Sequence, residues 1–139
     1  MLLQPKNNPF NFTQAQTNLI LGSYQVPKGY INLTDMCKRE GKHFADYYRN
    51  KSTREYLALV SEDLNIPNHK LIVFVKAYGN QGTWGHFDIA LDLARWVSIP
   101  FRIWSNRVLL HAFNGNFQAL TPDAEEAKHK LEVLRRRIF

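Results

Sequence analysis

Apolar residues in the first part of the chain come in short extended segments separated by turn-forming residues, a pattern typical of β-strands. The first segment covers residues 19–26, and the turn signal Pro27-Lys28-Gly29 separates it from a second one at residues 30–32. We therefore expect these two segments to pair as a β-hairpin. Residues 70–78 are also rich in β-formers and are expected to form a strand, followed by a loop at residues 79–82.

Between these strands, apolar residues recur at the three- and four-residue intervals of helices. A short helix is expected after its N-cap Thr34 and before Gly41, and a second one at residues 44–49. Ser52-Thr53-Arg54-Glu55 matches a capping box, in which Ser52 caps a third helix and Glu55 reaches back to the cap amide. That helix carries Tyr56, Leu57, Val60 and Leu64 on one face.

The second half of the chain is expected to be mainly helical. His86 precedes a helix that is apolar on most sides, with only Asp88, Asp92 and Arg95 on a narrow polar edge. Ser98-Ile99-Pro100 ends it, and the next helix is expected at residues 101–113. We expect four large aromatic side chains in the core. They are Tyr30, Trp84, Trp96 and Trp104.

This order of elements predicts an α+β fold, in which helices pack on a small antiparallel sheet. The folded domain is expected at residues 17–113, after a flexible lead at residues 1–16 that is rich in Asn, Gln and Pro. A last helix is expected at residues 121–139, with Thr121 as its cap and Pro122 in its first position. Its arginines at 135–137 leave three roles open: a further DNA contact, a dimerising coil or a packed final helix.

The charge of the chain points toward a polyanionic partner. Lys and Arg outnumber Asp and Glu by 18 to 12, which gives a net charge of +6. Residues 28–54 alone hold seven basic and three acidic side chains, and such clustering suits a surface that faces phosphates. Nucleic acid is the first candidate and an anionic membrane the second, whereas charge that serves only solubility is the plain alternative.

Other bulk features place the chain among folded intracellular proteins. Its 139 residues fit one domain, and 45% of them are hydrophobic. The single cysteine, Cys37, excludes an internal disulfide and suits a reducing compartment. The N-terminus has no signal-peptide pattern, and no apolar stretch approaches the length of a membrane span. We expect a soluble cytoplasmic protein that makes no membrane contact and is nucleoid-associated when it is bound to DNA.

Residues 44–64 have the pattern of a helix-turn-helix, with its tight turn at about Asn50. In such motifs the first turn of the second helix contacts DNA. Here that turn carries Lys51-Ser52-Thr53-Arg54, and side chains of these types bind phosphates or base edges. The alternative is that Ser52 and Glu55 only cap the helix and that the cations are only solvated.

Three motifs together carry a family resemblance. Gly82-Thr83-Trp84-Gly85-His86 leads into the helix with Leu91, Ala94 and Trp96, and it follows Gly29-Tyr30-Ile31-Asn32-Leu33-Thr34 and Lys51-Ser52-Thr53. In this order, over about residues 17–113, they resemble the KilA-N domain of phage, bacterial and large-DNA-virus proteins. That domain is related to the fungal APSES DNA-binding domain. Phe87 departs from the family pattern, in which a proline commonly follows the histidine.

The resemblance implies a DNA-binding module and no reaction. The relation to the APSES domain also implies a wing beside the helix-turn-helix, which would lie near Lys76 and the loop Asn80-Gln81. The candidate DNA-binding residues are Lys38, Arg39, Lys42, Arg49, Asn50, Lys51, Ser52, Thr53, Arg54 and Lys76.

Other chemistry finds little support in the sequence. Gly79, Gly82 and Gly85 precede a helix without the Lys-Ser or Lys-Thr of a phosphate loop, so they are expected to adopt positive φ angles while Trp84 packs on the core. Cys37 and His43 match no common zinc spacing, and His86 is expected to satisfy backbone groups at the helix entrance. We therefore expect no metal, no cofactor and no enzymatic activity.

The sequence thus predicts double-stranded DNA binding, in a regulatory role related to a phage or mobile element. The alternative is an antirepressor-type module that binds a repressor protein and has little DNA affinity. A nuclease is a third and weaker hypothesis. The sequence predicts no oligomeric state.

Overall fold

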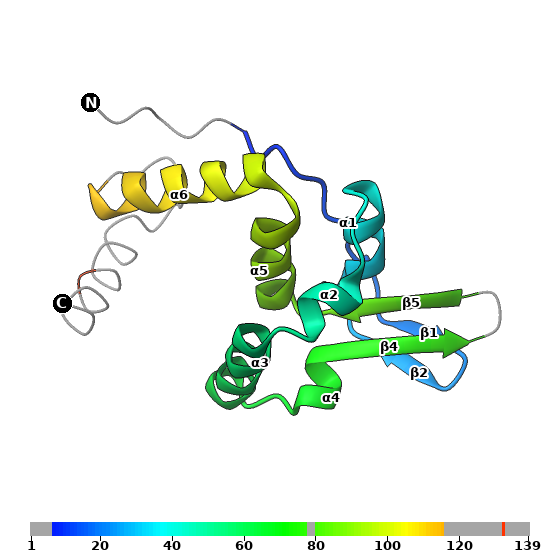
Figure 1. The fold of residues 1–139 in the computed structure, drawn as a ribbon. Helices are drawn as coiled ribbons and strands as arrows, with labels where there is room; N and C mark the ends of the chain where they lie inside the picture. The colour runs from blue at the N-terminus through cyan, green and yellow to red at the C-terminus, as the bar shows by residue number, and fades with distance from the viewer. Residues whose placement is uncertain (1–6, 78–79, 116–131, 133–139) are drawn as a thin grey trace.

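The computed structural model describes residues 7–77, 80–115 and 132 of the chain (Figure 1). Within these residues, short strands and helices come in separate runs along the chain, which is an α+β arrangement, as predicted. In chain order the elements are β1 Leu19–Leu21, β2 Tyr24–Val26, β3 Ile31–Asn32, α1 Leu33–Arg39, α2 Phe44–Tyr48, α3 Lys51–Leu64, α4 Asn68–Leu71, β4 Ile72–Ala77, β5 Asn80–Gly85, α5 Phe87–Val97 and α6 Ile99–Phe113. The predicted helix at 121–139 lies outside the described residues, apart from Glu132.

The strands form two small antiparallel sheets among the described residues, one with the order β3-β5-β4 and one formed by β1 and β2. The predicted hairpin between residues 19–26 and 30–32 is therefore wrong. Gly22 adopts a φ of +64°, so the chain turns between β1 and β2, and Leu21 pairs with Tyr24. Ile31 instead pairs with Gly85 of β5.

β4 and β5 form the longest strand pair, which runs from Ile72↔Gly85 to Ala77↔Asn80. The predicted loop at residues 79–82 is thus wrong for Asn80 to Gly82, which belong to β5. Side chains alternate across a strand, so Val73 and Val75 share one face, which packs against the β1–β2 hairpin. Phe74 and Lys76 share the opposite face.

The main core lies between the three-stranded sheet and the helices. Ile31, Leu33, Met36, Leu93 and Phe101 are almost completely buried there. A smaller cluster joins the hairpin to the sheet and contains Val26, Tyr30 and Val75. Tyr30 is buried, as predicted, and its hydroxyl donates to the Lys70 carbonyl at 2.7 Å. The three tryptophans are only partly buried and pack at the borders of the two clusters.

Residues expected to be a flexible lead also reach the core. The Phe10 side chain is buried and its ring lies edge-on to the Phe101 ring, with centroids 5.9 Å apart. Gln14 forms an antiparallel bridge with Ile31. This segment therefore adds apolar surface to the α1 side of the domain.

Two helix starts differ from the sequence prediction. Asn32 rather than Thr34 caps α1, because its side chain accepts from the Asp35 amide at 3.0 Å. Thr34 instead accepts from the Thr83 amide at 2.8 Å and ties α1 to β5. The capping box is also wrong: α3 begins at Lys51, so Ser52 lies inside its first turn. The predicted end of α1 is confirmed, since Gly41 follows it with a φ of +65°.

The Gly85–His86 junction positions α5. His86 is the N-cap of α5, and its Nδ1 accepts from the Asp88 amide at 3.1 Å, as expected for the helix entrance. Gly82 and Gly85 do not have positive φ angles, which corrects the prediction. Gly85 is needed for a different reason, because a Cβ atom there would lie 2.6 Å from Leu33 Cδ1.

α5 is largely buried, as predicted, although Phe87 and Leu91 are exposed. α6 starts two residues earlier than expected, and the Ser98 side chain caps it by accepting from the Phe101 amide at 3.2 Å. Four apolar residues of α6 are exposed, namely Ile99, Ile103, Leu109 and Leu110. None of the helices in the described ranges has the length and apolar character needed to cross a bilayer.

Candidate nucleic-acid interface

α2 and α3 are consecutive helices joined at Arg49 and Asn50, in the place where the sequence predicts a helix-turn-helix. Two tyrosine hydrogen bonds fix this unit to α5. The Tyr47 hydroxyl donates to Asp92 Oδ2 at 2.6 Å, and the Tyr56 hydroxyl donates to the Asp88 carbonyl at 3.0 Å. Leu57 of α3 is buried in the same core. The first turn of α3 is therefore held in a fixed orientation.

Both tyrosines remain neutral hydrogen-bond donors near neutral pH. Burial is the main cause that raises the pKa of Tyr47 well above its usual range, and the hydrogen bond to Asp92 acts in the same direction. Burial also raises the pKa of Tyr56 to about 12, with Asp92 and Asp88 as further causes. These two groups therefore add no charge to the surface around α3.

Most candidate residues at the start of α3 are exposed. The Arg49 side chain is 74% exposed and the Lys51 side chain 92%. Asn50 and Ser52 are exposed as well, and Asn50 makes no side-chain cap hydrogen bond. Thr53 differs from them, because it is only 5% exposed and faces the domain. The first turn thus presents cations and small polar groups to solvent, whereas Thr53 anchors it.

Nearby acidic groups balance these cations only weakly. Arg49 Nη2 lies 2.7 Å from Asp46 Oδ1, and Lys51 Nζ lies 3.9 Å from Glu55 Oε1. Exposed pairs of this kind contribute about 0–1 kcal/mol, so both cations can exchange their partner for a phosphate at little cost.

Arg54 is held in place by α2. Its Nε donates to the Tyr48 carbonyl at 2.8 Å, and its guanidinium carbon lies 4.1 Å from the centroid of the Tyr48 ring. The hydrogen bond uses one of the five guanidinium N–H donors. Because the side chain is already ordered, a contact to DNA through the other donors loses less conformational entropy.

A hollow of about 550 Å³ lies on the sheet side of α3, and we call it the aromatic hollow. Phe74 is 42% exposed in it, and the Phe74 and Tyr48 rings meet edge-on with centroids 5.3 Å apart. Lys76 is exposed on the same face of β4 as Phe74. The full lining is Phe44, Ala45, Tyr48, Arg49, Arg54, Phe74 and Thr83.

The candidate cations in and after α1 have other surroundings. Arg39 Nε lies 3.3 Å from Asp35 Oδ2, its Nη2 donates to the Asn11 carbonyl, and its guanidinium lies over the Phe10 ring. Lys42 Nζ lies 5.1 Å from the centroid of a Trp96 ring and donates to the Trp96 carbonyl at 3.3 Å. Lys38 is exposed in the last turn of α1.

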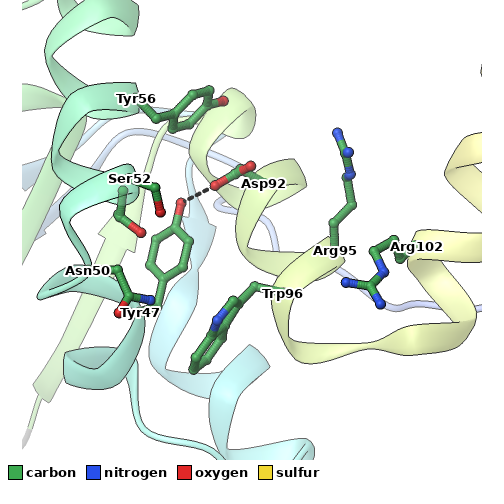
Figure 2. A pocket seen from close by; sticks show the side chains of 9 residues that line it. Tyr47, Asn50, Ser52, Tyr56, Asp92, Arg95, Trp96 and Arg102 are labelled. Carbon is green, nitrogen blue, oxygen red and sulfur yellow. Dashed lines mark hydrogen bonds between the residues drawn. The ribbon is translucent and has the colours of Figure 1, made fainter.

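A second hollow, of about 280 Å³, lies between the start of α3 and helices α5 and α6, and we call it the arginine hollow (Figure 2). Arg95 and Arg102 reach it from α5 and α6, opposite Asn50 and Ser52. Arg102 carried no signal in the sequence, and Arg95 stood out there only as part of the polar edge of α5. The full lining is Tyr47, Asn50, Ser52, Thr53, Tyr56, Asp92, Arg95, Trp96 and Arg102.

Metal-ligating side chains do not gather in the part of the chain that the structure describes. No group of three or more His, Cys, Asp or Glu residues lies close enough there to hold an ion. Cys37, considered above as a ligand, is buried on the inner face of α1.

Comparison with known protein families decides the family. The model of the KilA-N domain matches residues 16–114, which is most of the chain and includes every candidate residue from Lys38 to Lys76. The chain belongs to the KilA-N domain family. KilA-N domains are generally DNA-binding modules.

Three curated relatives, all named as KilA-N domain-containing proteins, come from large DNA viruses. Two are from Acanthamoeba polyphaga mimivirus: one is 29% identical over 54% of this chain and 23% of its own length, and the other is 31% identical over 49% and 19%. A third, from Invertebrate iridescent virus 6, is 22% identical over 72% of this chain and 30% of its own. The chain thus matches less than a third of each relative. No solved structure matches it.

Proposed function

We propose that this KilA-N domain binds double-stranded DNA, with the first turn of α3 in the major groove. The observation that carries the proposal is the exposure of Arg49 and Lys51, at 74% and 92%, beside the ordered Arg54 at the start of one rigid helix. A major groove is about 12 Å wide and admits such a helix. The helix start also offers backbone amides to a phosphate.

Each side chain of this turn has a defined role in the proposal. Arg49 and Lys51 bind phosphates, because their long and exposed side chains are paired only with surface acids. Arg54 is oriented by Tyr48, so it suits bidentate contact with a guanine edge or a phosphate. Asn50 and Ser52 supply hydrogen bonds, and Thr53 holds the turn on the domain.

The sheet side of α3 gives a second part of the proposed contact. Lys76 on β4 binds the DNA backbone, as the wing of a winged helix does. The exposed Phe74 ring faces the aromatic hollow beside Arg49 and Arg54, where it is suited to apolar contact with a thymine methyl group. The cations of the sequence prediction that lie near α1 contribute less, since Arg39 and Lys42 are bonded to distant segments of the fold, at Asn11 and Trp96.

A regulatory role in a virus or mobile element is the finer part of the proposal. Its support is the family membership and the viral origin of the relatives above. A domain with this surface acts by occupying DNA, and no catalytic step is required of it.

The test is fluorescence anisotropy with a random 30-base-pair duplex at two salt concentrations. The wild type is compared with the triple variant Arg49→Ala, Lys51→Ala and Arg54→Ala. A control triple variant, Lys28→Ala, Lys70→Ala and Arg107→Ala, removes the same charge from exposed residues elsewhere, in the turn before β3, in α4 and in α6. We expect the first variant to reduce the salt slope by about 2.7, from three phosphate contacts of about 0.9 each. The control should change the slope much less.

Two outcomes would overturn the proposal. Absence of binding by the wild type at the lower salt concentration would exclude general DNA binding and favour the repressor-binding alternative. Equal losses in both variants would show that net charge, rather than the α3 surface, carries the binding. Incubation of the duplex with Mg²⁺, Mn²⁺ or Zn²⁺ checks the nuclease hypothesis, and we expect the DNA to stay intact.

A further inference from the structure

The arginine hollow is lined by two arginine side chains that are available to a ligand. Arg95 and Arg102 are exposed, and neither side chain makes an ion pair or a hydrogen bond within residues 7–77 and 80–115. They come from different helices, α5 and α6, yet line the same hollow (Figure 2). Two guanidinium groups that share one hollow repel each other, so this arrangement favours an anion between or beside them.

The hollow has one carboxylate, that of Asp92, and this group already accepts a hydrogen bond. Its Oδ2 accepts from the Tyr47 hydroxyl at 2.6 Å. The other lining residues are neutral, including Tyr56, whose hydroxyl donates to the Asp88 carbonyl. The lining therefore carries two positive charges against one negative charge, and the negative charge already has a hydrogen-bond donor.

The position of the hollow identifies the anion. Asn50 and Ser52 form its α3 wall, and both belong to the turn that we place in the major groove. A helix in that groove has a phosphate backbone on each side. The aromatic hollow lies on the sheet side of α3, and the arginine hollow lies on the side of α5 and α6. With α3 in the groove, each hollow would therefore face a different backbone.

We propose that Arg95 and Arg102 bind phosphates of the second DNA strand and clamp the duplex against the start of α3. This inference rests on the proposed function, and it adds contacts from α5 and α6 to a surface otherwise formed by α3 and the sheet. Phosphates of DNA, rather than a free phosphate ion, are the ligand, since the hollow is open and continuous with the α3 turn.

The experiment measures the salt dependence of duplex binding for the double variant Arg95→Ala and Arg102→Ala. The matched control is Lys70→Ala and Arg107→Ala, which also removes two exposed cations, one of them from α6. We expect the first variant to lower the salt slope by about 1.8, from two contacts of about 0.9 each. The control should leave the slope nearly unchanged. Thermal melting of both variants verifies that they fold, as expected for exposed side chains.

Two further measurements separate a phosphate clamp from other causes. Arg95→Lys with Arg102→Lys keeps the charge and should recover most of the slope. Inorganic phosphate, added to the wild type with the ionic strength held constant, should not displace the duplex. If it does displace the duplex and the double variant resists it, the hollow binds free phosphate and the clamp is wrong.

The failure of this inference differs from the failure of the proposed function. If the wild type binds and the α3 triple variant loses slope, but the Arg95 and Arg102 variant behaves like its control, only the clamp is wrong. If the wild type does not bind the duplex, both proposals are wrong.

Discussion

The cations near α1 and those at the start of α3 belong to the same basic stretch of chain, but they make different contacts. Arg39 and Lys42 lie over aromatic rings and donate to backbone carbonyls of distant segments, Asn11 and Trp96. Arg49 and Lys51 project into solvent and meet only surface acids of their own helices. The first pair connects parts of the fold, whereas the second pair is available to a partner.

This difference shows why a count of charges overestimates a binding surface. A cation that connects distant segments of the fold, as Arg39 and Lys42 do, must give up a tertiary contact when it turns toward a phosphate. Arg54 differs, because it lies on Tyr48 of the neighbouring helix and keeps its remaining N–H donors for a partner. A surface ion pair loses much less when it exchanges partners. The net charge of the basic stretch therefore measures the attraction of DNA at long range, whereas the contact is defined by the cations that do not connect distant parts of the fold.

Removal of the two sets of cations in separate variants tests this difference most directly. The α3 set, Arg49, Lys51 and Arg54 to Ala, should lower the salt slope of duplex binding by about 2.7. The α1 set, Lys38, Arg39 and Lys42 to Ala, should lower it by about 0.9, since Arg39 and Lys42 are bonded to distant segments and leave the exposed Lys38 as the one contact. Anisotropy titrations at several salt concentrations measure both values. Equal slopes would contradict the distinction.

The α1 set should instead affect stability. Loss of two cation–π contacts is expected to cost about 0.5–1 kcal/mol each, and the thermal melting temperature should fall accordingly. The α3 set loses one such contact, that of Arg54 with Tyr48. A larger loss of stability in the α3 set than in the α1 set would reverse this assignment.

The second prediction concerns the packing that holds α1 on the sheet. Gly85→Ala should destabilise the fold by about 1–3 kcal/mol, because the new methyl group would lie 2.6 Å from Leu33 Cδ1. Gly82→Ala, in the same strand, is the control, since its Cβ would meet only Thr34 Oγ1 at 3.9 Å. Urea denaturation of the two variants gives the difference. Similar midpoints would show that Leu33 moves aside without cost.

The third prediction is a smaller effect, an increase in the affinity for DNA. Asp46→Asn removes the acid beside Arg49 and should strengthen duplex binding by up to about fivefold, within the 0–1 kcal/mol range of exposed pairs. Glu62→Gln makes the same charge change at the far end of α3, where the residue is exposed. If the two variants gain equally, the gain comes from net charge and not from release of Arg49.

The smallest effect concerns the buried side of α1. Burial raises the pKa of the Cys37 thiol from 9.0 to about 11, although Lys42 opposes the shift. The unfolded chain therefore releases this proton at lower pH than the folded domain. The buried thiol's contribution to the free energy of unfolding is complete below pH 9 and is lost as the pH rises toward 11. Cys37→Ala should show a shallower loss of stability between pH 8 and 10, before tyrosines titrate in the unfolded chain. Denaturation at each pH gives the slopes, and an unchanged slope would contradict the burial of Cys37.

Local patterns in the sequence predicted most helices correctly, because a helix depends on neighbours three and four residues away. The turn at Asn50, the buried face of α3 and the His86 entrance to α5 are all confirmed. Strand pairing was predicted poorly, since residues 31–32 found their partner more than fifty positions away in β5. The capping box failed because α3 starts at Lys51, which places Ser52 inside the helix.

The sequence by itself determined the family, the α+β class and the basic character of residues 28–54, since these follow from motif order, spacing and composition. Only the tertiary structure decided which charges are free. It placed Arg39 and Lys42 on aromatic rings, and it brought Arg95 and Arg102 to the same hollow as Asn50. The physical reason is that a cation's partners are set by distances between side chains of different elements, and the spacing of residues along the chain does not contain those distances.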